Sequence, residues 1–192
     1  MRGLTTLALT LTALLCTATP AAAGFTIYTD KTAWEAAVSG QFATEDFSDS
    51  VLNAGVSFVS SESGHINPAQ EVYQDVLAST SQNDPMTTWT FTPQMSAFGG
   101  NWTLGGPGGS GNSLQVSIAD TSEYVGWISN SYGGEFWGFT SDVPFSSVKL
   151  AGGSGTNQQN CSLDDMVYSE LPEPASLALL ALGGLGFLRR RA

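Results

Sequence analysis

The chain has 192 residues, of which 17 are acidic and six are basic, giving a formal net charge of −11. That length fits one ordinary domain. The basic residues gather at the two ends, so the segment 24–174 holds two lysines against all 17 acids, a net charge of −15. Such a segment repels nucleic acid and anionic membrane surfaces, whereas cations and neutral partners such as polysaccharides are compatible with it.

The first 23 residues have the layout of a secretory signal peptide. Arg2 gives a charged start, residues 4–16 are mostly apolar, and Ala21-Ala22-Ala23 supplies small residues. This pattern predicts cleavage by a signal peptidase between Ala23 and Gly24. The exported body would then begin at Gly24.

One cysteine, Cys161, remains after this cleavage, because Cys16 lies within the leader. An intrachain disulfide is then excluded. Cys161 is either buried or a point of intermolecular linkage, and we favour burial because unpaired cysteines behave mostly as small hydrophobic residues.

The first two elements of the body differ in period. Residues 25–29 alternate and predict a strand. Trp34, Ala37 and Val38 then fall at helical spacing, with Asp30 placed to cap the helix and Gly40 placed to end it. We therefore expect one short helix over 30–38.

The rest of the body returns to a period of two, interrupted by glycine, proline and asparagine. Strands are expected over 55–60, 87–92, 95–102, 113–119, 124–128, 135–140, 146–150 and 163–168, with 61–85 ambiguous and 104–112 a glycine-rich loop. About nine short strands predict an all-β sandwich or barrel, one domain over 24–170. The expected core comprises Trp89, Phe91, Phe98, Trp102, Leu114, Val116, Ile118, Phe136, Phe139, Phe145, Val148 and Leu150, and Trp34 is also expected to be buried.

The C-terminal segment predicts a membrane helix. Residues 175–188 form an uncharged run of 14 residues, followed at once by Arg189, Arg190 and Arg191. The run is shorter than the roughly 20 apolar residues of a comfortable span. Because basic residues at a helix end stay in the cytoplasm, the run stops transfer with the body outside and the arginines inside.

Pro172-Glu173-Pro174, the apolar run and the arginine cluster together resemble the PEP-CTERM sorting signal of Gram-negative bacteria, over residues 171–192. Leu171 stands where that family often has valine. The resemblance implies a membrane enzyme, exosortase, as the partner that processes the chain near the Pro-Glu-Pro box. It also implies export across the inner membrane, transient anchoring, then the cell surface or extracellular space, and a link to exopolysaccharide and biofilm matrix.

Short landmarks in the body resemble those of many exported PEP-CTERM proteins. They are Asp46-Phe47, Gly55-Val56-Ser57-Phe58, Ala97-Phe98-Gly99, the run 138–145 and the run 163–168. The resemblance implies a jelly-roll-like β-sandwich similar to carbohydrate-binding modules.

The body offers little catalytic chemistry. His65 is the one histidine, and its surroundings lack the G-x-S-x-G frame of a nucleophile turn. One histidine and one cysteine are too few for a zinc site built from these ligands. Glycoside hydrolysis needs two carboxylates across a cleft. Glu123 and Glu135 are candidates, but pairs are unavoidable among so many acids, so no catalytic residue is assigned.

Asp164 and Asp165 are the candidate metal site. On a regular strand their side chains point to opposite faces, so one of them should lie near the inward side or at the mouth of the strand. It would accept structural hydrogen bonds, the reading we favour, or bind calcium with other oxygens, for example from Asp46 and Asp49.

Trp127, Tyr132 and Trp137 cluster around one predicted hairpin. If Phe136 is in the core, alternation places Trp137 on the outer face or under a crossing loop, with Trp127 beside it in the first case. Three exposed aromatic rings would form a platform for a neutral polysaccharide.

The sequence therefore predicts an exported surface or matrix protein without catalytic activity. A carbohydrate-binding module is the alternative, and a glycoside hydrolase is the least favoured class. No cofactor is expected beyond the possible calcium.

Overall fold

The computed structural model describes residues 23–77, 83–105, 113–153 and 159–170. Several predicted features lie outside these residues: most of the leader with Ala21, the C-terminal membrane helix, the Pro-Glu-Pro box with Pro172, Glu173 and Pro174, and the cluster Arg189, Arg190 and Arg191. Within the described residues, no helix has the length and apolar character needed to cross a membrane.

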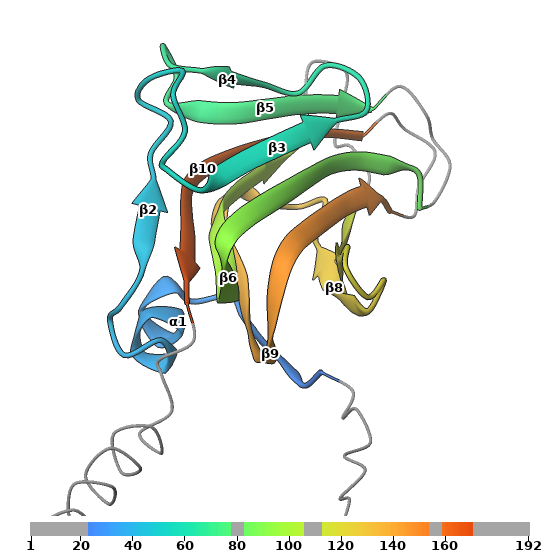
Figure 1. The fold of residues 1–192 in the computed structure, drawn as a ribbon. Helices are drawn as coiled ribbons and strands as arrows, with labels where there is room; N and C mark the ends of the chain where they lie inside the picture. Colours follow the sequence, from blue (N-terminus) through green and yellow to red (C-terminus); the bar gives the residue numbers. More distant parts are fainter. Residues whose placement is uncertain (1–22, 78–82, 106–112, 154–158, 171–192) are drawn as a thin grey trace, which may run out of the picture.

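The fold is all-β with one short helix, as predicted (Figure 1). Two pairs of predicted strands are fused into 20-residue strands, and the ambiguous segment contains two strands. The elements are β1 Phe25–Tyr28, α1 Lys31–Ala37, β2 Ala43–Glu45, β3 Val56–Ser60, β4 His65–Asn67, β5 Val72–Leu77, β6 Pro85–Leu104, β7 Leu114–Ile118, β8 Tyr124–Ile128, β9 Gly133–Gly152 and β10 Gln159–Ser169.

Capping residues mark the two ends of the helix α1. The Asp30 side chain accepts a hydrogen bond from the Ala33 N–H at 2.8 Å, and Gly40 follows the helix with φ of +69°. The buried Trp34 donates from its indole Nε1 to the Phe139 carbonyl oxygen at 3.1 Å. That bond fixes α1 against β9.

Two long strands, β6 and β9, pair along their lengths and take part in both layers of the fold. The first half of β6 and the second half of β9 lie between β3 and β7, with β8 beyond β7. The other halves lie between β10 and β1, and β10 also pairs with β5 and β2. Every pairing is antiparallel, and the curved path of β6 and β9 is visible in Figure 1.

The core lies between the two layers. Trp89 from the first half of β6 meets Tyr73 of β5 with ring centroids 4.9 Å apart, and Phe91 meets Tyr168 of β10 at 5.4 Å. All 12 predicted core residues are buried, and so is Trp34. Burial of Cys161 is also confirmed, and it raises the pKa of the thiol.

The core and the strand pairing of the described residues all lie between Phe25 and Ser169. The buried hydrophobic residues run from Trp34 to Tyr168, and the strands pair with one another between Phe25 and Ser169. The body 24–170 therefore contains the parts it needs to fold on its own.

Candidate functional site

Two aromatic side chains stand exposed on β8. Tyr124 is 49% exposed and Trp127 is 37% exposed, and their ring centroids are 6.0 Å apart. In the described part of the chain, β8 pairs with β7 alone, so it forms a sheet edge. We call these two residues the β8 aromatic pair.

A β-bulge explains why these two residues share a face. Val116 is opposite Gly126, but Ser117 is opposite Tyr124, so Val125 is the extra residue on β8. A bulge reverses the alternation beyond it. Val125 and Gly126 are both buried, and Tyr124 and Trp127 on either side of them are exposed.

Polar residues of β7 lie beside the β8 aromatic pair. Gln115 is opposite Trp127 and Ser117 is opposite Tyr124. Side chains directly opposite each other on neighbouring strands are about 5 Å apart at Cβ, so the Gln115 amide can reach a molecule stacked on the Trp127 ring. Neither Tyr124 nor Gln115 was a predicted site residue, because the bulge is not visible in the sequence.

Trp137 does not belong to this surface, and the predicted platform of Trp127, Tyr132 and Trp137 is wrong in this respect. Trp137 is 3% exposed, and its ring lies 3.2 Å from where a Cβ on Gly126 would stand. Phe136 is buried too, with its ring 6.0 Å from that of Trp34. Both faces of β9 are covered here, one by α1 and the other by the opposite layer.

Tyr132 is partly buried against the main core rather than standing beside Trp127 as a free ring. Burial, and after it the charge of Glu135, raise the pKa of the Tyr132 hydroxyl. Of the three predicted platform residues, Trp127 alone is substantially exposed.

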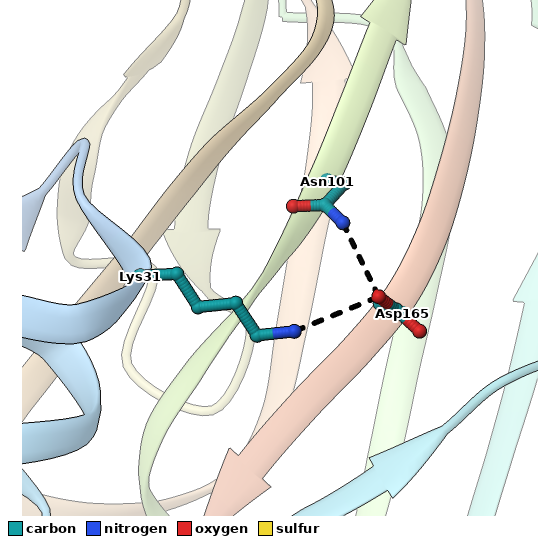
Figure 2. A network of polar contacts seen from close by, with 3 residues as sticks. All are labelled: Lys31, Asn101 and Asp165. Atoms are coloured by element: carbon teal, nitrogen blue, oxygen red, sulfur yellow. Dashed lines mark hydrogen bonds and ion pairs between the residues drawn. The ribbon is translucent and has the colours of Figure 1, made fainter.

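Asp165 is paired with a cation from the protein itself. Its carboxylate lies 3.5 Å from the Lys31 Nζ of α1 and accepts a hydrogen bond from the Asn101 Nδ2 of β6 at 3.4 Å (Figure 2). The contacts join α1, β6 and β10. Both charged side chains are partly exposed, so the ion pair contributes little to stability, about 1 kcal/mol or less.

Neither Asp164 nor Asp165 faces inward, the first of the two predicted placements, because the strand is irregular at this point. Asp165 has a φ of +46°, and the register with β6 shifts between Asp164 and Val167. Leu163 and Met166 are consequently both buried, and Asp164 is exposed. Residual burial, and then the charge of Asp165, raise the pKa of Asp164.

The described residues contain no group of three acidic, histidine or cysteine side chains placed to hold a metal ion. Asp46 and Asp49, the suggested additional ligands, each accept a backbone hydrogen bond within their own loop, from Ser48 at 3.0 Å and from Val51 at 2.6 Å. The geometry favours the structural interpretation of these aspartates, and calcium stays a prediction.

An open, mostly apolar groove lies between the loop before β3 and the start of β4. Its volume is about 550 Å³, and it is lined by Ser50, Val51, Leu52, Val56, Phe58, Gly64, His65 and Ile66. His65 Nδ1 is 2.9 Å from the Ser63 carbonyl oxygen. The lining includes no carboxylate, so it does not provide the acid pair of a glycosidase.

The buried carboxylates hold loops and strands together. Glu45 accepts hydrogen bonds from the backbone N–H groups of Phe47 at 3.2 Å and Asn53 at 2.6 Å. Asp75 accepts from the hydroxyls of Tyr73 at 2.9 Å and Thr87 at 2.5 Å. These contacts satisfy the two buried acids with partners in the fold.

The two carboxylates suggested for hydrolysis also accept hydrogen bonds within the fold. Glu123 accepts from the backbone N–H of Ala23 at 3.3 Å and from the Thr121 hydroxyl at 3.4 Å. Glu135 accepts from the backbone N–H of Gly133. Each of the two acids thus has a hydrogen-bond partner within the protein.

Residues 170–192 match the PEP-CTERM protein-sorting motif. The match confirms the predicted sorting signal, and it indicates an exported protein of a Gram-negative bacterium that an exosortase sorts to the cell surface. No curated protein and no solved structure shows significant similarity to the chain, so the comparisons do not support the predicted likeness of the body to carbohydrate-binding modules.

Proposed function

We propose that this protein is held in the inner membrane after export, is processed by an exosortase near its Pro-Glu-Pro box, and then acts at the cell surface or in the biofilm matrix without catalysis. The observation that carries the proposal is the match of residues 170–192 to the sorting motif. Association with exopolysaccharide follows from the family resemblance of the tail.

The junction between body and tail supports processing at the box. The last strand, β10, ends at Ser169, whose hydroxyl donates to the Gln41 carbonyl oxygen at 2.6 Å. Pro172 follows three residues later. Cleavage at or after the box would therefore leave every described strand intact, and the residue before each proline is biased toward an extended conformation that an enzyme can grip.

The arrangement of the body suits an anchored protein. Figure 1 places the start of β1 and the end of β10 at one end of the body, and β4 and β5 at the other. A body anchored through its C-terminus would present the end with β4 and β5, and the groove beside β4, away from the membrane.

The test replaces Pro172, Glu173 and Pro174 together with alanine in the exported protein. Processing should stop while export continues, because the apolar run and the arginines stop transfer without the box. Intact-mass measurement of the mature protein reads out the C-terminus. Leu171→Val, which restores the residue common in the family, is the matched control and should be processed normally. An unchanged C-terminus in the triple variant would refute the assignment.

A second candidate function, carbohydrate binding, is favoured by the β8 aromatic pair with Gln115 beside it. An exposed ring can stack on the apolar face of a sugar while the amide hydrogen-bonds its hydroxyls. The net charge of −15 over 24–174 favours a neutral polysaccharide over an anionic one.

Trp127→Ala should abolish retention of the body on an insoluble neutral polysaccharide. Val59→Ala removes another exposed apolar side chain, 72% exposed on β3, and should leave retention unchanged. Equal retention of both variants would exclude the β8 aromatic pair as the binding site.

We propose further that the body needs no metal. Removal of calcium with a chelator should then leave its melting temperature unchanged, because a cation bound only to the folded state would raise it by mass action. A lower melting temperature after chelation, restored by added calcium, would instead establish a calcium site.

A further inference from the structure

The N-terminal end of the body is bound by an aspartate of β9. The β1·β9 ladder runs from Tyr28 to Phe25, which is opposite Ser141. One step beyond, the Gly24 N–H donates to the Asp142 Oδ1 at 2.6 Å, and the Asp142 N–H donates back to the Gly24 carbonyl oxygen at 3.2 Å. A Cβ on Gly24 would lie 2.8 Å from the other carboxylate oxygen, so the carboxylate sits directly against this glycine.

We infer that Asp142 is a binding site for the α-ammonium group that forms at Gly24 when the leader is removed. The inference rests on the predicted cleavage between Ala23 and Gly24, and it is independent of the events at the C-terminal tail. In that hydrolysis, water adds to the Ala23 carbonyl carbon, the C–N bond breaks, and Ala23 leaves as a carboxylate. The Gly24 nitrogen takes up the protons and becomes an ammonium at neutral pH.

Cleavage changes the chemistry of the Gly24 nitrogen, but the nitrogen stays in a position to donate to Asp142. Before cleavage it is a neutral amide with one N–H to donate. Afterwards it has three N–H donors and a positive charge, and charge-assisted hydrogen bonds to carboxylates are roughly twice as strong as neutral ones. The contact with Asp142 becomes an ion pair.

The surrounding charges favour a cation here. The hydrogen bonds of this end of the chain go to two acids, Asp142 and Glu123, the latter accepting from Ala23 at 3.3 Å. Neither lysine of the body offers a competing partner, since Lys31 pairs with Asp165 and Lys149 lies on β9 opposite Ser117 and Thr88. Removal of Ala23 takes away the hydrogen bond to Glu123 Oε1, while Glu123 Oε2 keeps its bond from the Thr121 hydroxyl.

This arrangement makes the mature body more stable than a chain with a blocked N-terminus. An ammonium stabilised by Asp142 has a higher pKa in the folded state than its ordinary value of about 8. Its contribution to stability is therefore fully present below about pH 8 and is lost as the pH rises through the folded-state pKa.

The experiment compares the body 24–170 carrying a free α-amine with the same chain acetylated at the Gly24 nitrogen, which keeps one N–H donor and removes the charge. At pH 6 the free-amine form should melt about 1–3 °C higher, the size expected of an exposed ion pair in a domain of this length. The difference should disappear at pH 10 and in Asp142→Asn.

Glu71→Gln is the matched control, because it removes one negative charge immediately before β5, a strand that β9, β6 and β10 separate from β1. It should preserve the difference between the two forms. A difference that persists in Asp142→Asn, or none at pH 6, would overturn the inference.

Two direct readouts complete the test. N-terminal sequencing of the exported protein should begin at Gly24, and any other start overturns the inference. An NMR titration should give the Gly24 α-amino group a pKa above 8 that returns to its ordinary value in Asp142→Asn. A failed C-terminal processing experiment would not alter either result.

Discussion

Truncation of Trp137 to alanine should destabilise the body severely, whereas the same change at Trp127 should be tolerated. Trp137 is 3% exposed, and its ring packs 6.0 Å from Phe139 and against the space left by Gly126. Removing a buried tryptophan ring costs about 3–5 kcal/mol, because the transfer energy is lost and a cavity remains. A domain of this size has about 5–15 kcal/mol of stability, so the loss is a large fraction of the total.

Trp127 is 37% exposed at a sheet edge, so Trp127→Ala should cost about 1 kcal/mol or less. The assay is urea denaturation of the body 24–170 and of each variant, followed by tryptophan fluorescence and far-UV circular dichroism. Thermal melting should show a drop of roughly 6–20 °C for Trp137→Ala and at most a few degrees for Trp127→Ala. Equal losses for the two variants would refute the assignment of Trp137 to the core and of Trp127 to the surface.

Two further predictions concern carboxylates of the fold. Asp75→Ala should lower the free energy of unfolding, measured by urea denaturation, by about 3 kcal/mol, because it removes the buried acceptor of the Tyr73 and Thr87 hydroxyls. A loss below about 1 kcal/mol would mean that these hydroxyls find other partners. Burial raises the pKa of Asp120, but hydrogen bonds from Ser147 and Ser146 outweigh it and hold the pKa below 3.8. Its small contribution to stability is present above that value and is lost as the pH falls through the folded-state pKa, so Asp120→Asn should lower the melting temperature at pH 6 more than at pH 2.5.

The core could be predicted because large apolar residues recur with a period of two. Trp89 and Phe91, or Val148 and Leu150, fall on one face of a strand whatever the strand pairs with, and all of them are buried. The short helix could also be predicted, since Asp30 caps it and Trp34 marks its buried side. Such local patterns specify elements and their inward faces without reference to partners distant in the sequence.

The two long strands could not be predicted, because each contains a proline where it passes between the layers. Pro93 lies in the exposed stretch 92–94 of β6. Pro144 lies in the exposed stretch 142–144 of β9. A proline inside a strand normally indicates an edge or an interruption. Here the register of β6 with β9 shifts between Thr90 and Met95 while the chain stays extended, so two segments predicted as separate strands form one strand.

The candidate site was mispredicted for a different reason. Phe136 and Trp137 do face opposite sides of the strand, but the predicted platform required the Trp137 side to be open. In the structure Phe136 lies beneath α1, in contact with Trp34, and Trp137 enters the main core. The face of β9 that carries Phe136 is covered by a helix more than 90 residues away in the sequence. A local sequence pattern cannot predict a contact between segments so far apart.

Two bulges determine what this body presents to its surroundings. At Val125 the extra residue turns Val125 and Gly126 inward and leaves Tyr124 and Trp127 together on the outside. At Asp165 the irregular backbone brings a carboxylate to Lys31 instead of burying it. Bulges re-aim side chains in this way at sheet edges and near binding sites. Of these two local exceptions to strand alternation, the one at Val125 creates the exposed aromatic pair on which the carbohydrate-binding proposal rests.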